Sequence, residues 1–201
     1  MITVSFDNME EIRRVYDPIL VERATRTAIS KLTTTASKEV SLAVRDKYQI
    51  KAGRIKQSLK RRITARSQGE ARGFLIYTSS RLSLANFASR TGSGSPGRSA
   101  RPKIKTARGM RLGARVRVLR NRPSKVVKGA FWAPGTGGVW QIWKRETEAR
   151  RPIRKLAGPS VSHMIRSAEA LSAVEKTLQA RSTIEIAAAI KFHSGRRAGV
   201  L

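Results

Sequence analysis

The N-terminal part of the chain carries hydrophobic residues at the spacing of an α-helix. Asp17-Pro18 predicts the start of this helix, because aspartate caps helix N-termini and proline suits the first helical position. The apolar stripe that follows is built largely from small side chains: Val21, Ala24, Ala28, Leu32, Ala36, Val40, Ala43 and Val44. Such a stripe allows a close approach by a second helix and leaves part of the core to another element or subunit.

A second helix is predicted beyond Lys51-Ala52-Gly53, where the apolar pattern of the first helix is broken. Ile55, Leu59 and Ile63 lie four residues apart, which places them on one face of a helix. Its other face is expected to be basic and to carry Lys56, Lys60, Arg61 and Arg62. We therefore expect residues 20–62 to form an N-terminal helical part.

Residues 64–145 change to the alternation of apolar and polar positions that is typical of strands. The first such signal covers Phe74–Thr78, and three more cover Arg115–Leu119, Val126–Phe131 and Val139–Arg145. The glycine-rich residues 134–138 lie between the last two, which predicts an antiparallel hairpin. We expect a small, basic, antiparallel β-sheet.

Residues 89–103 interrupt this β part with the sequence SRTGSGSPGRSARPK. A segment rich in glycine, serine and proline is typical of a flexible loop. One interpretation is a mobile spacer, and the other is a flexible basic arm that reaches a partner. We favour the arm, because a spacer does not need four basic residues among fifteen.

A second long helical pattern follows Gly158-Pro159, with Ser160 as a suitable N-cap. Its apolar stripe is Val161, Met164, Ile165, Ala168, Leu171, Val174 and Leu178. We expect residues 159–192 to form a C-terminal helical part. Taken together, residues 1–201 predict one α+β domain with N-terminal helices, a small antiparallel basic sheet with a long flexible loop, and a C-terminal helix.

The formal net charge of +29 over 201 residues is unevenly distributed. Residues 51–145 hold twenty-four Lys or Arg residues and one acid, Glu70. Such a segment repels itself unless an anionic partner or solvent surrounds it. The partner can be nucleic acid, whose phosphates give sequence-independent affinity, or an acidic protein surface. The basic residues expected to face it are Lys56, Lys60, Arg61, Arg62, Arg98, Arg101, Lys103, Lys105, Arg108, Arg111, Arg115 and Arg117.

The absence of cysteine excludes disulfides and thiolate metal sites, and it fits synthesis in a reducing cytoplasm. No apolar run approaches the roughly 18 residues that span a bilayer. The first residues lack the basic and apolar regions of a signal peptide. We expect a protein that is made in the cytoplasm, has no membrane partner and leaves the cell only inside an assembly.

No group of residues has the spacing of a catalytic, cofactor or metal site. His163 and His193 each lack a second histidine at metal-binding spacing. Glu70 is alone in the basic segment, so paired carboxylates are not available there. Residues 135–138 lack the Gly-Lys-Ser/Thr ending of a P-loop and join two predicted strands. We therefore expect no enzyme, no cofactor and no metal.

Four aromatic residues lie among the bases of the predicted hairpin: Phe131, Trp132, Trp140 and Trp143. Aromatic residues interleaved with bases can stack on single-stranded nucleic acid. Trp140 and Ile142, however, alternate as core-facing strand residues do, with Trp143 on the opposite face. The pattern therefore favours sheet packing or a protein interface.

Three blocks of the sequence together point to a known family. The first is residues 22–62, where an alanine-rich helix is expected to run into a basic helix. The second is Val127–Phe131 followed by Trp140–Arg145, and the third is Arg151–Val161, which leads into the last helix. Through these blocks the chain resembles the prophage minor tail protein Z family of lambda-like phages.

The resemblance implies a structural, non-enzymatic virion protein that is made in the host cytoplasm and acts late in assembly as a minor tail or tail completion component. Its implied partners are tail tube, tail terminator, neck or baseplate proteins, with genomic DNA as a further candidate. Because phage tails are rotationally symmetric, we expect a homo-oligomeric ring, with a hexamer favoured, at one end of the tail tube. The ring would be needed for head–tail joining or DNA passage. The alternative is a non-specific, electrostatic nucleic-acid binding protein.

Overall fold

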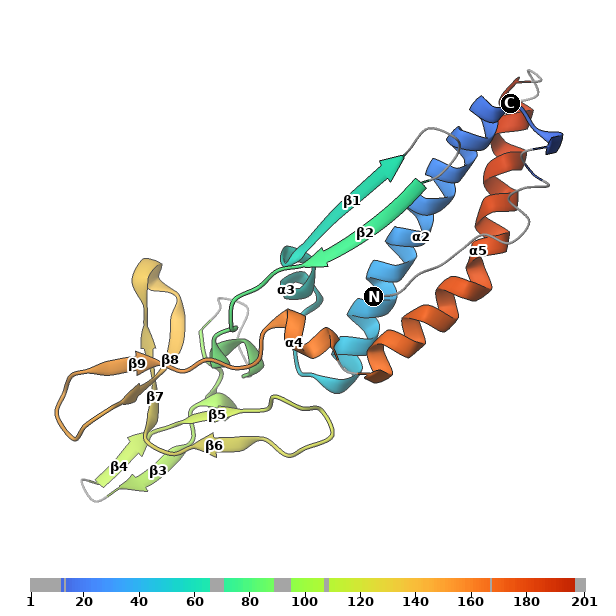
Figure 1. Cartoon of the computed structure of the whole chain (residues 1–201). Helices are drawn as coiled ribbons and strands as arrows, with labels where there is room; N and C mark the ends of the chain where they lie inside the picture. Colours follow the sequence, from blue (N-terminus) through green and yellow to red (C-terminus); the bar gives the residue numbers. More distant parts are fainter. Residues whose placement is uncertain are drawn as a thin grey trace. The chain divides into compact units, whose positions relative to one another are not determined.

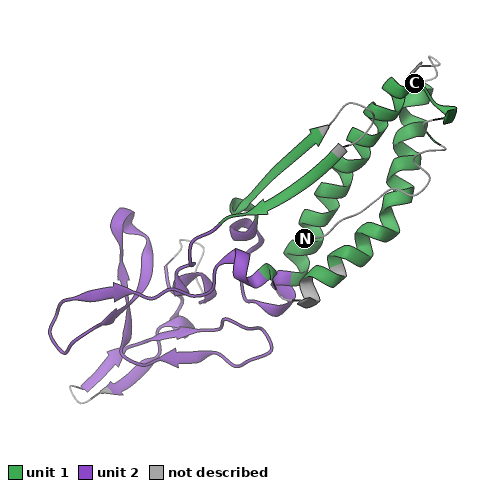
Figure 2. Ribbon diagram, in the orientation of Figure 1, with its two compact units in different colours: residues 1–43, 56–78, 165–201 green, residues 44–55, 79–164 purple. Residues whose placement is uncertain are grey.

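The structure is a computed structural model that describes residue 12 and residues 14–65, 71–88, 95–106, 109–166 and 168–197. It contains helices and small antiparallel sheets, which confirms the predicted α+β class. The chain divides into two compact units, and folding as the single domain expected from the sequence stays a prediction. Unit 1 combines residues 1–43, 56–78 and 165–201, and unit 2 combines residues 44–55 and 79–164 (Figure 2).

The predicted N-terminal helix is confirmed as α2, Pro18–Lys47 (Figure 1). Oδ1 of Asp17 accepts a 2.8 Å hydrogen bond from the backbone N–H of Ile19, so Asp17 caps the first turn. The predicted stripe is buried throughout, except at the half-buried Ala43. The apolar spacing and the cap are local signals, and they were sufficient to place this helix.

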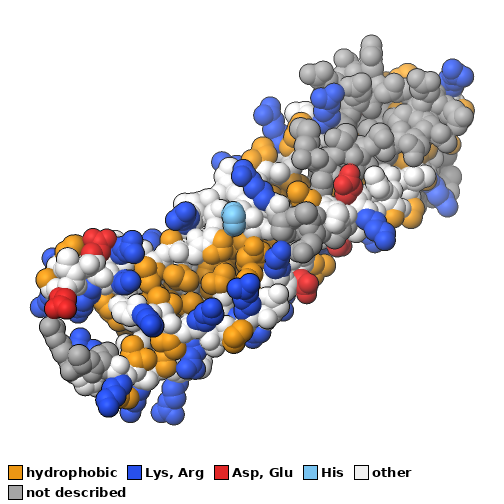
Figure 3. All heavy atoms as spheres, turned by 60° about the horizontal axis from the view of Figure 1, so that its bottom comes forward, with side chains coloured by type: hydrophobic (Ala, Val, Ile, Leu, Met, Phe, Trp, Pro, Cys, Tyr) orange, Lys and Arg blue, Asp and Glu red, His pale blue; other side chains and the backbone are white. Residues whose placement is uncertain are grey.

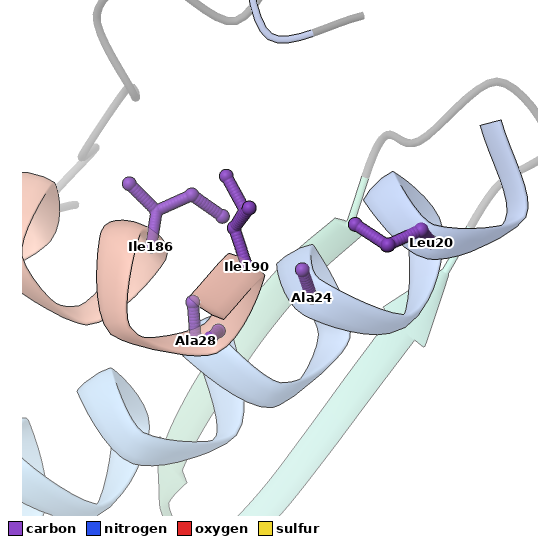
Figure 4. Close-up of a cluster of buried hydrophobic side chains, with 6 residues drawn as sticks. Leu20, Ala24, Ala28, Ile186 and Ile190 are labelled. Carbon is purple, nitrogen blue, oxygen red and sulfur yellow. The ribbon is translucent and has the colours of Figure 1, made fainter. Parts of the chain in front are cut away.

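The C-terminal helical pattern is confirmed as α4, Val161–Ile165, and α5, Ala168–Arg197. The hydroxyl of Ser160 accepts a 3.2 Å hydrogen bond from the N–H of His163 and thereby caps α4, as predicted. Within unit 1, α5 packs against α2 through Leu20, Ala24, Ala28, Ile186, Ala189 and Ile190 (Figure 4). The small side chains of α2 make room for the isoleucines of α5, which is the close approach that the stripe predicted.

The second N-terminal helix is shorter than predicted, and the prediction is wrong beyond residue 57. Helix α3 spans only Ala52–Gln57, and strand β1, Leu59–Ala65, follows it. β1 pairs with β2, Ala71–Tyr77, in an antiparallel hairpin. Residues four apart share one face of a strand as well as one face of a helix, so the spacing alone could not distinguish the two.

The inner face of the β1–β2 hairpin lies against α2. Nη1 of Arg61 donates a 3.1 Å hydrogen bond to Oγ1 of Thr34. A Cβ atom at Gly73 would lie 2.4 Å from Cγ2 of Thr33 and 2.8 Å from Cγ2 of Ile29. The hairpin therefore approaches the helix closely at a position where only glycine fits, and this contact fixes which face of the hairpin points outward.

The described part of unit 2 is mainly antiparallel β structure. β3, Lys103–Thr106, pairs with β4, Gly109–Leu112, and β5, Ala114–Val116, pairs with β6, Lys125–Val127. β7, Ala130–Pro134, β8, Trp140–Arg145, and β9, Ile153–Lys155, form a three-stranded sheet in that order. The predicted hairpin is confirmed as β7–β8, and its loop contains a 3-10 turn, Thr136–Gly138. The β3–β4 hairpin and β9 were not predicted.

The core of unit 2 forms where β5, β7 and β8 meet the 3-10 turn η1, Leu84–Phe87. Its buried members are Ala85, Ala114, Val116, Ala130 and Ile142. The flexibility expected of residues 89–103 stays a prediction, and residues 95–103 are the described part of this segment. Pro96 and Ala100 are buried, and the segment contains the 3-10 turn η2, Arg98–Ala100, and the first residue of β3. Residues 89–94 lie outside the described residues.

Candidate partner-binding surfaces

The basic residues predicted between residues 56 and 62 do not share one face. Lys60 and Arg62 are exposed on the outer face of β1, and Lys56 is exposed near the end of α3. Arg61 lies on the inner face of the hairpin, where its guanidinium group reaches α2. The prediction of one basic helix face is therefore wrong, because alternation along a strand sends neighbouring side chains to opposite sides.

On the outer face of the β1–β2 hairpin, each exposed apolar residue lies directly opposite a cation. The register pairs Arg62 with Phe74 and Lys60 with Ile76. Phe74 is 37% exposed and Ile76 is 44% exposed, and Arg72 is exposed on the same face. Within the described residues β1 and β2 pair only with each other, so both outer edges of the hairpin are open.

The β3–β4 hairpin of unit 2 has the same arrangement. Lys103 pairs with Leu112, and Lys105 pairs with Met110. Both lysines are exposed, and the two apolar side chains are more than half exposed. Arg111 is exposed on the opposite face of the ribbon. Both faces were missed from the sequence, because residues 59–63 were predicted to be helical and the β3–β4 hairpin was not predicted.

The other predicted bases of unit 2 are spread over several elements. Arg98 is exposed in η2, whereas Arg101 and Arg115 are half-buried. Arg108 lies outside the described residues. The side chains of these residues differ in solvent exposure. The number of basic residues in the sequence therefore did not show which of them can contact a partner.

Arg117 uses its guanidinium group within its own loop. Its Nε donates a 3.1 Å hydrogen bond to the carbonyl oxygen of Arg122, and its Nη2 donates to the carbonyl oxygen of Arg120. Its backbone N–H also donates to the carbonyl oxygen of Phe87 at 2.9 Å. Arg117 therefore supports the turn that follows β5, which makes it a poorer candidate for partner contact than the hairpin lysines.

The three tryptophans of the β7–β8 hairpin are all half-buried. Nε1 of Trp132 donates to the carbonyl oxygen of Ala100 at 2.9 Å, and Nε1 of Trp143 donates to that of Ala133 at 3.2 Å. Trp132 also packs against the core of unit 2. The indoles of Trp132 and Trp143 thus have hydrogen-bond partners inside the unit, which supports packing over base stacking.

Cations and apolar side chains also lie together elsewhere on unit 2. The guanidinium carbon of Arg145 lies 5.3 Å from the ring centroid of Phe131, which is cation–π geometry. A different contact, an ion pair, joins Arg154 to Glu146, where Nε of Arg154 lies 3.9 Å from Oε1 of Glu146. Figure 3 shows one face of the molecule on which Lys and Arg side chains surround hydrophobic ones and acidic side chains are few.

The histidines occupy separate places. His163 is exposed on α4, and Nε2 of His193 lies 2.9 Å from Oγ1 of Thr27. Within the described ranges, no three His, Cys, Asp or Glu residues gather where they could hold a metal ion. In the same part of the chain, no helix has the length and apolar character needed to cross a membrane.

The comparison with protein families gives one result that covers almost the whole chain. The family described as prophage minor tail protein Z matches residues 6–196. No curated protein and no solved structure matches the chain. The match includes both helical parts, both exposed hairpins and the β7–β8 hairpin. The chain therefore belongs to the prophage minor tail protein Z family, and its role is a structural one in the phage tail.

Proposed function

We propose that this chain completes the tail by forming a homo-oligomeric ring, with a hexamer favoured, at one end of the tail tube. The ring makes the tail competent for head–tail joining or DNA passage. Neighbouring tail tube, terminator, neck or baseplate proteins are its partners. The protein acts as a structural connector without catalytic chemistry.

The observation that carries this proposal is the pair of exposed hairpins, β1–β2 and β3–β4, which present cations and apolar side chains side by side. Exposed apolar residues gain free energy when a partner covers them, at roughly 25 cal/mol per Å² of buried apolar surface. A subunit of a closed ring needs at least two such surfaces, because it contacts neighbours and the structure on which the ring sits.

The proposal is tested with phage particles that lack this protein. We expect tails without it to assemble but to fail to join filled heads or to deliver DNA, and we expect added purified protein to restore infectivity. Electron cryomicroscopy of complete particles should place the chain in a ring at one tail end. Normal joining and infectivity without the protein, or its absence from purified complete tails, would contradict the proposal.

A second candidate function is non-specific DNA binding, which is favoured by the exposed basic ribbon β3–β4 with Lys103, Lys105 and Arg111. The slope of log affinity against log salt becomes shallower by about 0.9 for each phosphate that the protein no longer neutralises. Replacing all three residues by alanine should flatten the slope by about 1.8 on a short DNA duplex if only the face with Lys103 and Lys105 meets phosphates, and by about 2.7 if Arg111 on the other face does so too.

The matched control replaces Arg26, Lys38 and Lys176 by alanine, because these residues are exposed on α2 and α5 and the change in charge is the same. An equal decrease of DNA affinity in both triple variants would attribute binding to the net charge of the chain. In that case the ribbon would not be a DNA site.

A further inference from the structure

The outer face of the β1–β2 hairpin combines two kinds of side chain that one partner must satisfy together. Lys60, Arg62 and Arg72 supply three positive charges, and the described residues of this face include no acid. Phe74 and Ile76 are partly exposed between them. Since the register sets each apolar residue opposite a cation, a bound partner that covers one necessarily meets the other.

The face is held in a fixed orientation by its inner side. Arg61 donates to Thr34 of α2, and Gly73 lies too close to Thr33 for any side chain to fit between them. A hairpin that is anchored in this way loses little backbone conformational entropy when its outer face binds a partner. The outer face is therefore suited to recognition.

We propose that this face docks an acidic surface of a neighbouring tail protein, in which carboxylates flank apolar side chains. This inference rests on the proposed function, because it assigns one of the subunit's tail contacts to a particular surface. Carboxylates can pair with Lys60 and Arg62, while apolar partner atoms cover Phe74 and Ile76. Within the described residues β1 and β2 pair with no third strand, so a partner can add backbone hydrogen bonds at their outer edges.

Charge selects this partner over a second copy of the chain. Two copies that met face to face would place three cations against three cations, and like charges at an interface are strongly unfavourable. Another surface of a neighbouring copy would also be a poor partner, because the chain has 42 Lys and Arg residues against 13 Asp and Glu residues. Cations on open strand edges also discourage pairing between identical edges. Nucleic acid would satisfy the cations and could stack a base on the ring of Phe74, but it would leave the exposed side chain of Ile76 without an apolar partner.

The first experiment maps the contact in assembled tails. A Phe74→p-benzoylphenylalanine variant is incorporated into particles and irradiated, and the cross-linked partner is identified by mass spectrometry. Phe192→p-benzoylphenylalanine is the control, because Phe192 is also in unit 1 and is 44% exposed on α5. We expect position 74, and not position 192, to cross-link to an acidic tail protein.

Three results at position 74 would overturn the docking proposal: a cross-link to a second copy of this chain, a cross-link to DNA, or no cross-link from particles that contain the variant. Equal cross-linking from positions 74 and 192 would also overturn it. If particles do not contain even the wild-type protein, the proposed function fails instead, so the two failures are distinguishable.

The second experiment tests the charge. Lys60→Glu combined with Arg62→Glu is compared with Arg26→Glu combined with Lys38→Glu, which changes the net charge equally at exposed positions of α2. Binding of each purified protein to purified tails that lack it is measured against salt, after circular dichroism has verified folding. We expect the hairpin variant alone to lose about tenfold or more in affinity. Equal losses in both variants would contradict a specific docking face.

Discussion

The indole N–H of Trp132 donates a 2.9 Å hydrogen bond to the carbonyl oxygen of Ala100, which lies 32 residues earlier in the chain. This bond joins the 3-10 turn η2 to strand β7. Ala100 is 1% exposed, so its carbonyl has little access to solvent as an alternative partner. The glycine- and serine-rich composition around η2 is typical of a mobile loop, and this bond attaches η2 to a strand of the unit 2 core.

Trp132→Phe should destabilise unit 2 by about 1–3 kcal/mol, because the Ala100 carbonyl loses its partner while most of the ring packing is retained. Trp143→Phe is the comparison, since its 3.2 Å bond to Ala133 joins residues that are both half-buried. We expect a smaller loss there. Urea unfolding followed by tryptophan fluorescence measures both, and an equal or smaller loss in Trp132→Phe would contradict the role of the bond.

Gly73→Ala should destabilise unit 1 by about 1–3 kcal/mol, because the added Cβ would overlap the side chains of Thr33 and Ile29 on α2. Gly53→Ala is the matched control. A Cβ at Gly53 meets nothing within 4 Å, and alanine favours the helix α3 that contains this residue. The two substitutions should therefore have opposite signs in thermal unfolding. A neutral Gly73→Ala variant would mean that the hairpin does not approach α2 this closely.

Asp17→Ala should lower the stability of α2 by about 1 kcal/mol, because the backbone N–H of Ile19 loses the oxygen that accepts its hydrogen bond. Asp17→Asn retains an accepting side-chain oxygen and should lose much less. The free energy of unfolding of the three proteins, measured at one pH and salt concentration, gives the result. Equal losses in the alanine and asparagine variants would show that the negative charge matters more than the hydrogen bond.

Tyr77 should make the stability of unit 1 depend on alkaline pH. Burial raises the pKa of Tyr77 above its usual 10.0, and a hydrogen bond with Ser37 and the charge of Arg61 partly oppose the shift. The folded state therefore keeps the phenol proton at a pH where the unfolded state has lost it. The resulting stabilisation is fully present below pH 10.0 and is lost as the pH rises through the raised pKa.

Tyr77→Phe removes this titration and is otherwise close in shape. We expect the free energy of unfolding of the wild type, relative to the variant, to be constant below about pH 9 and to fall above about pH 10. The difference between the two free energies of unfolding removes the contribution of the lysines, because both proteins contain the same lysines. A difference that stays flat or rises with pH would contradict the burial of this phenol.

The sequence by itself determined the elements whose signals are local. The cap at Asp17, the apolar stripe to Val44 and the N-cap at Ser160 placed α2 and α4, and the glycine-rich loop placed the β7–β8 hairpin. A capping hydrogen bond, helical periodicity and a turn each depend on residues close in the chain, so they can be recognised without knowledge of the fold. The three blocks that resemble a tail protein family were local signals of the same kind, and the family match confirms them.

Only the tertiary structure decided that residues 59–65 form a strand, because Leu59 and Ile63 would share a face in a helix or in a strand. Pairing with β2 and contact with α2 favour the strand over the helix, and both interactions involve residues distant in sequence. The same pairing sent Lys60 and Arg62 outward and turned Arg61 toward α2. The sequence gives the number of positive charges. Which surface presents them depends on the strand register and on which face of the β1–β2 hairpin packs against α2.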